Sequence, residues 1–395
     1  MTPLNIFVVH PSDSLTDHLP NGAGWIDYNY LRGLAERGHT LHIAAPRVEL
    51  RGPVPPKMHL HVIPDCTQRG FGTRVKYILG VRRLLKRLRK DIRFDLAQQF
   101  TPVETGLSLA IAGSGIPLIL GPYSGHWAPE ATRGQRPGGL GTSIKQALRG
   151  AIAWLQQSQA DALVITCPAA IERIQSPSAR KSRVHVISHA IHSREYVARA
   201  EVPARRSILF LAILEYRKGI YTLLDAFHRV AQRLPDVTLE LWGDGGESSE
   251  VNKRIAGSPY RDRIIRHGRA SRDDVSSIMR AHSVYCMPSY GEPFGMTLLE
   301  AMASGVPVVT TDAGGPPFIV HEQGGRIVPM RDAEQLADSL LEILENRDLQ
   351  VSMGEYNRRR IEQEFDWSRS LDRMENLYAQ VLRRAPQDAL ERRTA

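Results

Sequence analysis

Cysteine is scarce in this chain of 395 residues. The three cysteines, Cys66, Cys167 and Cys286, lie far apart and show no CxxC spacing. An odd, sparse set of thiols argues against a disulfide framework and a cysteine-ligated zinc site, and it indicates a reducing compartment such as the cytoplasm. Hydrophobic residues make up 42% of the chain and charged residues 24%, which is typical of a globular protein.

Long hydrophobic runs are also absent. The most apolar stretch, Leu107–Pro122, is interrupted by two glycines and a proline and is too short to cross a bilayer. The segment Met1–Asn5 carries no positive charge, and Ile6–Val9 has the length of a strand, so no secretory signal is predicted. We therefore expect a cytoplasmic protein that is not integral to a membrane, with attachment to the inner membrane face as the alternative.

Acidic residues are few in the first half of the chain. Residues 1–200 carry 25 Lys or Arg and 13 Asp or Glu, whereas the whole chain has a net charge of +9. The excess is densest in Val75–Arg93, where Asp91 is the only acid. Apolar residues recur in this segment with the spacing of an amphipathic helix: Ile78, Val81, Leu85, Leu88 and Ile92.

Two interpretations of this basic helix are open. In the first, the apolar stripe packs on the core and the basic face is simply solvated. In the second, the helix lies against anionic lipid headgroups or receives an anionic acceptor. Nucleic acid is not an expected partner, because the charge is accompanied by no RRM, zinc-finger or helix-turn-helix signature.

Strands and helices alternate along both halves of the chain, which predicts an α/β fold with two doubly wound domains. The charged, weakly patterned segment 193–207 is the best linker candidate. Amphipathic helices are predicted at 333–345 and 367–382. The predicted parts are a first domain, a linker, a second domain and a polar tail: 1–192, 193–207, 208–366 and 383–395.

Two loops of the first domain are candidates for a binding crevice. Gly22 and Gly24 lie in a loop between a first strand and a helix predicted at Trp25–Arg37, but they lack the full GxGxxG spacing. Two interpretations of this loop stay open: a tight turn before the helix, and a loop that lines a cleft. His126 follows a later strand in a Gly-Pro turn, and loops after strand ends form the ligand crevice of open α/β sheets.

The strongest site signal is the stretch 289–311. Gly291, Pro293 and Gly295 predict a loop, and it is followed by a helix at Met296–Ser304 and a strand at Val306–Thr311. A glycine loop that leads into a helix N-terminus leaves backbone amides free for a phosphate, here those of Met296, Thr297 and Leu298.

Two carboxylates bracket this predicted anion site. Glu292 precedes the helix and Glu300 lies just over one turn into it. Carboxylates do not bind phosphate, but they accept hydrogen bonds from sugar hydroxyls. The combination of a phosphate site with two carboxylates indicates a sugar nucleotide.

Three motifs together resemble the retaining glycosyltransferases of family four, the glycosyl transferases group 1. They are Gly-Glu-Pro-Phe-Gly-Met-Thr-Leu-Leu-Glu at 291–300, Leu-Trp-Gly-Asp-Gly at 241–245, and Arg-Lys-Gly at 217–219 before a helix. The resemblance covers roughly residues 200–370, and the first half is similar in layout only. It implies the GT-B fold, in which two Rossmann-like domains face one another across a cleft, and in which the final helix, here 367–382, packs on the first domain.

The resemblance also implies roles for single residues. Glu300 would accept the ribose hydroxyls and Glu292 would face the donor sugar. Lys218 would neutralise the diphosphate beside the 296–298 amides. The backbone at Arg269 and Ala270 would contact the base, and His126 would contact the transferring sugar.

One departure from the family pattern concerns the diphosphate. Family members commonly have Gly-Arg where this chain has Ala212-Ile213, so the arginine that normally accompanies the lysine is missing. Arg217, beside Lys218, is the candidate substitute. No Asp-x-Asp occurs in the chain, so no metal is expected to bridge the diphosphate.

The implied activity is a metal-independent, retaining hexosyltransferase that moves a sugar from a nucleotide-diphosphate sugar to a hydroxyl acceptor. The acceptor would be a glycan or a lipid-linked glycan of a cell envelope or polysaccharide, and no other cofactor is expected. A covalent role for Glu292 stays open. The alternatives are a sugar-nucleotide epimerase or a glycoside phosphorylase on the same fold, and a non-catalytic nucleotide-sugar-binding protein.

Overall fold

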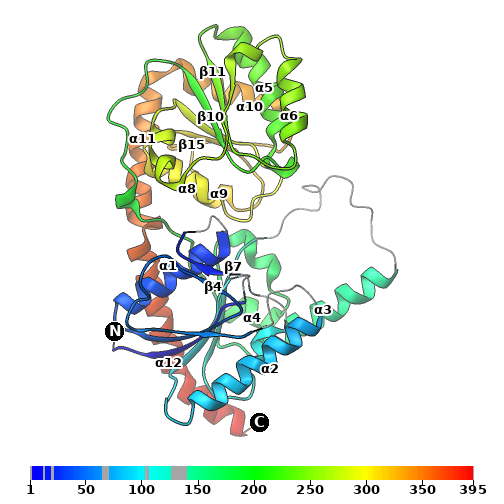
Figure 1. The fold of residues 1–395 in the computed structure, drawn as a ribbon, viewed down its shortest axis with the longest axis vertical. Helices are drawn as coiled ribbons and strands as arrows, with labels where there is room; N and C mark the ends of the chain where they lie inside the picture. The colour runs from blue at the N-terminus through cyan, green and yellow to red at the C-terminus, as the bar shows by residue number, and fades with distance from the viewer. Residues whose placement is uncertain are drawn as a thin grey trace. The chain divides into compact units, whose positions relative to one another are not determined.

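The computed structural model contains two α/β units, each with its own parallel sheet (Figure 1). The N-terminal unit comprises residues 1–124, 137–188 and 367–395, and the C-terminal unit comprises 125–136 and 189–366. The prediction of two doubly wound α/β folds is confirmed. The structure describes the following residues: 2–11, 14–18, 22–64, 71–101, 103, 106–125 and 140–394.

The N-terminal unit is built on a seven-stranded parallel sheet with the order β5-β3-β1-β6-β7-β8-β9. Its strands are short, and the central ones are buried, as expected for a sheet covered on both faces. The strands are β1 (Asn5–Val9), β3 (Thr40–Ala45), β5 (Met58–Val62), β6 (Leu96–Gln99), β7 (Leu118–Tyr123), β8 (Ala162–Ile165) and β9 (Val184–Val186). A separate two-stranded ladder pairs β2 (Leu15–Thr16) with β4 (Val48–Glu49).

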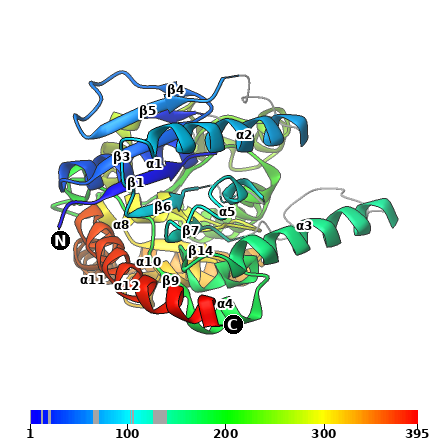
Figure 2. The same ribbon diagram turned by 90° about the horizontal axis from the view of Figure 1, so that it is seen from below.

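Seven helices, three of them short, accompany this sheet. They are α1 (Gly22–Glu36), α2 (Phe71–Leu88), η1 (Leu107–Ala110), α3 (Leu140–Ser158), η3 (Pro168–Arg173), α4 (Pro177–Ser182) and α12 (Trp367–Thr394) among the described residues. Figures 1 and 2 both show α3 extending away from the sheet. In the part of the chain that the structure describes, no helix is both long and apolar enough to cross a membrane.

The first helix begins earlier than the sequence predicted. Gly22 and Gly24 form the first turn of α1, so the predicted glycine loop ending before Trp25 is wrong. Gly24 is buried in this turn. Both glycines therefore present a helix N-terminus rather than an open loop.

The basic segment forms α2 as predicted, but the helix ends at Leu88 rather than at Ile92. The amides of Asp91 and Ile92 both donate to the Leu88 carbonyl, which closes the helix end. Tyr77 and Val81, with Leu84 and Leu85, form the buried stripe. The neighbouring basic side chains are exposed: Arg82, Arg83, Lys86, Arg87, Arg89 and Lys90.

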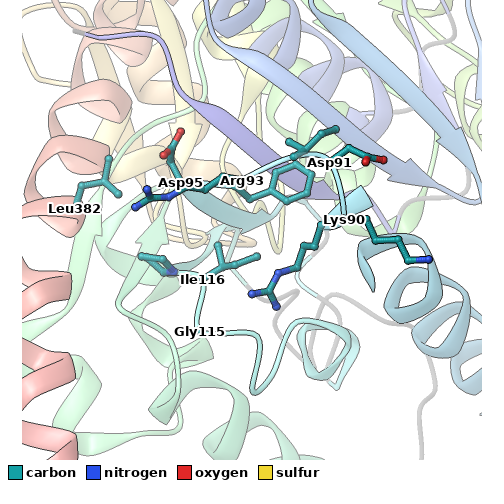
Figure 3. A pocket seen from close by; sticks show the side chains of 11 residues that line it. Lys90, Asp91, Arg93, Asp95, Gly115, Ile116 and Leu382 are labelled. Carbon is teal, nitrogen blue, oxygen red and sulfur yellow. The ribbon is translucent and has the colours of Figure 1, made fainter. Parts of the chain in front are cut away.

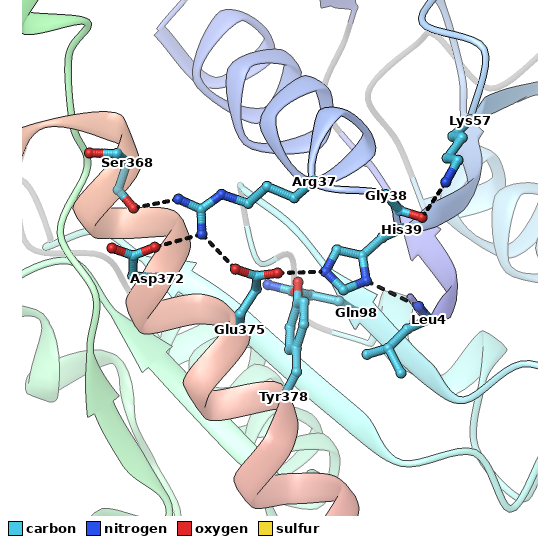
Figure 4. Close-up of polar contacts among 10 residues, drawn as sticks. All are labelled: Leu4, Arg37, Gly38, His39, Lys57, Gln98, Ser368, Asp372, Glu375 and Tyr378. Atoms are coloured by element: carbon cyan, nitrogen blue, oxygen red, sulfur yellow. Dashed lines mark hydrogen bonds and ion pairs between the residues drawn. The ribbon is translucent and has the colours of Figure 1, made fainter. Parts of the chain in front are cut away.

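The C-terminal helix α12 is part of the N-terminal unit and continues past the predicted end at Leu382 to Thr394. Figure 4 shows the polar contacts that hold it. Arg37 donates to Asp372 at 2.7 Å and to Glu375 at 2.5 Å. His39 accepts from the Leu4 amide at Nδ1, so its Nε2 carries the proton and donates to Glu375 at 3.0 Å. The Arg-Gly-His sequence thus serves as a docking point for α12.

The C-terminal unit has a six-stranded parallel sheet with the order β12-β11-β10-β13-β14-β15. The core is formed by strand residues such as Phe210 together with Phe227 and Leu340 from the covering helices. The strands are β10 (Ser207–Leu211), β11 (Thr238–Trp242), β12 (Ile264–Arg266), β13 (Val284–Met287), β14 (Val308–Thr311) and β15 (Gly325–Val328).

The helices of this unit alternate with the strands. The longer ones are α5 (Ile220–Arg233), α6 (Ser248–Ala256), α8 (Met296–Ala303), α10 (Ala333–Glu345) and α11 (Arg347–Arg360). The shorter ones are η4 (Ser193–Glu195), η5 (Tyr216–Lys218), η6 (Arg261–Arg263), η7 (Arg272–Asp274), α7 (Val275–Arg280), α9 (Pro316–Ile319) and the π-helical η8 (Ile361–Phe365).

The predicted linker, 193–207, is folded onto the C-terminal unit. The Arg199 guanidinium donates to the carbonyls of His282, Ser283 and Gln350 at 2.9 to 3.2 Å. Its amide donates to the Ser304 carbonyl at 3.0 Å. Arginine hydrogen bonds, together with the buried side chains of Tyr196 and Val202, fix the segment in place.

Candidate functional site

Two loops of the C-terminal unit pack tightly against one another at the carboxyl ends of the strands. One follows β10 and contains η5, and the other follows β13 and leads into α8. Gly219 has φ +70°, and a Cβ there would lie 1.7 Å from the Pro288 carbonyl oxygen. The Tyr290 amide donates to the Arg217 carbonyl at 2.7 Å. This edge of an open α/β sheet is where ligands bind.

The N-terminus of α8 provides two amides for an anion. Gly295 caps the helix with φ +113°, a conformation that favours glycine. The Leu298 amide donates to the Gly295 carbonyl at 3.0 Å, so the prediction that this amide is free is wrong. The tight first turn consumes it. Among the described residues the amides of Met296 and Thr297 have no hydrogen-bond acceptor, and they lie at the positive end of the α8 dipole.

Lys218 and Glu292 form an ion pair. The Lys218 Nζ lies 2.6 Å from Glu292 Oε2, and the two side chains are 13% and 10% exposed. The backbone of Glu292 is fixed, because its amide donates to Ala313 and its carbonyl accepts from Gly315. The two predicted site residues are therefore together, and each neutralises the other in the absence of a ligand.

Glu300 is held by a tyrosine from the predicted linker. The Tyr196 hydroxyl donates to Glu300 Oε1 at 3.1 Å. Burial raises the pKa of Glu300, while the nearby Arg272 and the Tyr196 hydrogen bond act in the opposite direction. Tyr196 was missed by sequence analysis because it lies in a segment without hydrophobic periodicity.

Thr297 and Tyr285 connect the start of α8 to the sheet. The Tyr285 hydroxyl donates to Thr297 Oγ1 at 2.8 Å, and burial raises the pKa of Tyr285. Tyr285 belongs to β13 and is fully buried. Because Tyr285 lies in an apolar strand pattern, the sequence indicated a core residue and did not indicate that its hydroxyl would contact α8.

The arginine proposed to replace the missing family residue is already paired. Arg217 lies 2.5 Å from Glu215, on the same short turn as Lys218. Ile213 is 46% exposed, so the position of the departure is at the surface and holds no charge.

The loop after β12 contains Arg269 and Ala270, which are exposed and partly exposed. It is tied to the β11 loop, because the Gly243 amide donates to the Gly268 carbonyl at 2.9 Å. Trp242 and His267 stack at this point, with ring centroids 4.1 Å apart and planes 8° apart. No sequence pattern indicated this aromatic pair.

A partly buried carboxylate, that of Glu240, supports the stacked pair. The nearby His282 and His267 lower the pKa of Glu240 to about 2. The Glu240 Oε2 atom lies 3.0 Å from His267 Nε2 and 3.2 Å from His282 Nε2. The His267 ring is thereby held in a fixed orientation over Trp242.

The remaining predicted residues lie elsewhere. Gly22 and Gly24 belong to the N-terminal unit. His126 falls outside the described residues. Within the described ranges, no group of three His, Cys, Asp or Glu side chains is placed to hold a metal ion.

A hollow of about 710 Å³ lies in the N-terminal unit, where β6 and β7 begin. Figure 3 shows Arg93, Asp95 and Leu382 on one side of it and Lys90 on the other. Because it adjoins the amino ends of the strands, it is not the crevice where open α/β sheets bind their ligands.

Comparison with known proteins agrees with the two-unit architecture. Residues 197–360 match the family model "Glycosyl transferases group 1", and residues 21–190 match "Glycosyl transferase 4-like domain". The N-acetyl-alpha-D-glucosaminyl L-malate synthase of Bacillus anthracis is 22% identical over 92% of this chain and 94% of its own length. The chain belongs to the GT-B glycosyltransferases.

Other relatives of this glycosyltransferase match over part of their length. A phosphatidyl-myo-inositol mannosyltransferase of Mycobacterium leprae is 34% identical over 45% of this chain, and the match spans about half of that enzyme (47%). The lipopolysaccharide core biosynthesis glycosyltransferase LpsE of Rhizobium meliloti is 29% identical over 57% of this chain and 65% of its own length.

Solved structures share the fold of the glycosyltransferase. HepE of Anabaena, in complex with UDP, superposes with a TM-score of 0.74 at 17% identity, covering 95% of this chain and 100% of that one. Sucrose-phosphate synthase of Thermosynechococcus elongatus gives 0.72 at 19% identity, with 95% and 99% covered. At these identities the likeness establishes the fold alone.

Proposed function

We propose that this glycosyltransferase transfers a hexose from a nucleotide-diphosphate sugar to a hydroxyl acceptor, with retention of the anomeric configuration and without a metal. The observation that carries the proposal is the arrangement around α8. Two amides that have no acceptor among the described residues, the Glu292 carboxylate and the Glu300 carboxylate lie on α8 and its preceding loop, and Lys218 of η5 pairs with Glu292.

The charges of the reaction fit this arrangement. Cleavage of a sugar–diphosphate bond places negative charge on the leaving phosphate and positive charge on the sugar ring. The Met296 and Thr297 amides, with the helix dipole, would stabilise the phosphate. Lys218 would place a cation at the diphosphate, and Glu292 would stay beside the sugar. Binding of a donor would therefore separate the Lys218–Glu292 ion pair.

The nucleoside would be bound by α8 and by the loop after β12. Glu300 would accept the ribose hydroxyls, and the backbone at Arg269 and Ala270 would contact the base beside the Trp242–His267 stack. Gly22, Gly24 and His126 stay predictions for the acceptor side and the transferring sugar.

The donor and acceptor classes are supported by related proteins. A structural relative was solved with UDP and another crystal of it with UDP-glucose, which favours a uridine nucleotide as the first donor to test. The named mannosyltransferase and lipopolysaccharide relatives favour an acceptor in a glycolipid or envelope glycan. No further cofactor is proposed.

The first experiment measures thermal unfolding of the full chain with UDP, GDP and ADP sugars, because a donor that binds only the folded state stabilises it by mass action. Transfer is then assayed with the stabilising donor, and the anomer of the product is read by NMR. Glu300→Ala and Lys218→Ala are expected to fold and to lose most turnover, whereas the exposed Lys253→Ala is the matched control. Unchanged kcat/KM in both site variants would contradict the assignment.

The assay also separates the alternatives. Hydrolysis of the donor, its epimerisation, or phosphate-dependent release without an acceptor would favour an epimerase or a phosphorylase. Binding without turnover across acceptors would favour a nucleotide-sugar-binding protein. That alternative is favoured by one observation: Arg217 is paired with Glu215, and Ile213 offers no second cation.

We also propose that the N-terminal unit binds an anionic membrane surface through the segment Val75–Arg93. The exposed face of α2 is basic, and Val75 and Leu79 on the same helix are 39% and 45% exposed. Right-handed connections place α2 and α3 on the same face of the sheet. On α3, Leu148 and Trp154 are 62% and 49% exposed, which adds exposed apolar side chains to that face.

Flotation with liposomes tests this surface. The native chain is expected to float with vesicles that contain anionic lipid and to remain behind with neutral vesicles. Arg83→Glu with Lys86→Glu should abolish flotation, whereas Lys253→Glu with Arg261→Glu, an equal charge change on exposed residues of the C-terminal unit, should leave it intact. Equal flotation of both variants would contradict the proposal.

A further inference from the structure

The Tyr196 side chain is held by several contacts, although it lies in a connecting segment. Its ring is buried, with 6% of the side chain exposed, and its hydroxyl donates to Glu300 Oε1. Arg358 on α11 fixes the backbone on both sides of this contact. Its Nη1 donates to the Tyr196 carbonyl at 2.6 Å and to the Ala303 carbonyl, at the end of α8, at 2.9 Å. The tyrosine and the helix that carries Glu300 are therefore bound to one common group.

The second oxygen of Glu300 remains available. Among the described residues no hydrogen bond reaches Oε2, and this atom is not among the fully buried polar atoms without a partner. A carboxylate with one oxygen fixed and the other open has a defined orientation toward a ligand. A tyrosine hydroxyl suits this task because it donates one hydrogen bond and brings no charge.

We propose that Tyr196 is a positioning residue for nucleotide binding, which turns Glu300 so that Oε2 accepts the ribose hydroxyls of the donor. The inference rests on the proposed function, and it adds a residue that lies outside every motif of the sequence. Without the hydroxyl, Glu300 would rotate freely or turn toward Arg272. The nucleotide would then have to reorder it on binding, which we expect to weaken binding about tenfold.

The dependence on pH separates positioning from a merely structural role. Burial raises the pKa of Glu300, and the charged or titratable groups near it are Arg272, Tyr196 and Tyr285. The Tyr196 hydrogen bond stabilises the ionised carboxylate. Its removal raises the pKa of Glu300 further, so nucleotide affinity should begin to fall at a higher pH. The phenyl ring of Tyr196→Phe preserves the packing.

The experiment is calorimetric titration of the full chain with UDP, GDP and ADP between pH 5 and pH 8. We expect Tyr196→Phe to raise Kd about tenfold and to move the acidic fall in affinity to higher pH. Tyr356→Phe, which removes a hydroxyl bonded to His321 on α11's exposed side, should behave like the native chain. In a Glu300→Gln background, Tyr196→Phe should change Kd less than twofold, because the carboxylate that it orients is gone.

Glu300→Asp provides a second route if Tyr196→Phe does not fold. It keeps the carboxylate but shortens it out of reach of the hydroxyl, so it should weaken binding in the same direction. If Tyr196→Phe has native affinity at every pH while Glu300→Gln loses binding, the role of Tyr196 is refuted but the proposed function is not. Absence of nucleotide binding by the native chain would overturn the proposed function and the inference with it.

Discussion

Acid should destabilise the edge of the N-terminal sheet through three stacked histidines. His42 on β3 stacks on His59 of the neighbouring β5, with ring centroids 4.6 Å apart and planes 18° apart. The His61 ring, also on β5, stacks on His42 with centroids 5.5 Å apart, and its Nε2 lies 3.2 Å from His42 Nδ1. The edge of the Phe94 ring completes the enclosure of His42, which is 6% exposed.

The size of the effect follows from the pKa of His42. Burial, with repulsion from His59 and His61, lowers the pKa of His42 from 6.5 to about 4. The folded state therefore binds fewer protons than the unfolded state, so stability is complete above pH 6.5 and falls as the pH drops toward 4. The linkage relation gives a loss of about 2 kcal/mol at pH 5, and solvent screening at an edge strand reduces the expected loss to about 1 kcal/mol.

The measurement is hydrogen–deuterium exchange of peptides from β3 and β5 at pH 7 and pH 5, with rates corrected for intrinsic exchange. His42→Phe keeps an aromatic ring but cannot titrate, so its opening free energy should change less with pH than that of the native chain. Asp27 acts in the opposite direction, because burial raises its pKa to about 6. The comparison of the two proteins cancels that contribution. An equal pH dependence in both would refute the reasoning.

Three further changes test other parts of the structure. Gly219→Ala should abolish nucleotide binding or prevent folding, because its Cβ would overlap the Pro288 carbonyl; a native thermal midpoint with native affinity would contradict the loop geometry. Glu375→Gln should lower the stability of the N-terminal unit by about 2 kcal/mol, since it removes the charged acceptor of His39, and chemical denaturation measures this. Ile213→Arg should leave the thermal midpoint unchanged and tighten nucleotide binding in calorimetry, because the position is exposed; unchanged affinity would indicate that a cation there does not reach the diphosphate.

Local patterns predicted the elements around the candidate site closely. The apolar run 284–287 forms β13, and the helix predicted from Met296 ends at Ala303, one residue before the predicted end. Glycine, proline and hydrophobic spacing act within a few residues, so the sequence carries this information directly. For α2 the pattern predicted the helix, but of the predicted stripe only Val81 and Leu85 are buried, whereas Ile78, Leu88 and Ile92 are half-buried.

Other expectations failed where a distant group decided the outcome. The Leu298 amide was expected to be free, but the first turn of α8 closes on it. The linker at 193–207 stays a prediction, but the sequence did not indicate that its Arg199 would donate to the carbonyls of three distant residues. Hydrogen bonds of this kind leave no periodic trace in the sequence.

The sequence by itself determined the alternation of strands and helices, the basic character of the first half, and the glycine, lysine and glutamate residues of the site. Only the tertiary structure decided how these residues are paired. Lys218 and Glu292 are 74 residues apart, and Tyr196 and Glu300 are 104 apart. Secondary structure follows from neighbours along the chain, whereas such pairs form because burial removes water from charged groups that must then find partners across the fold.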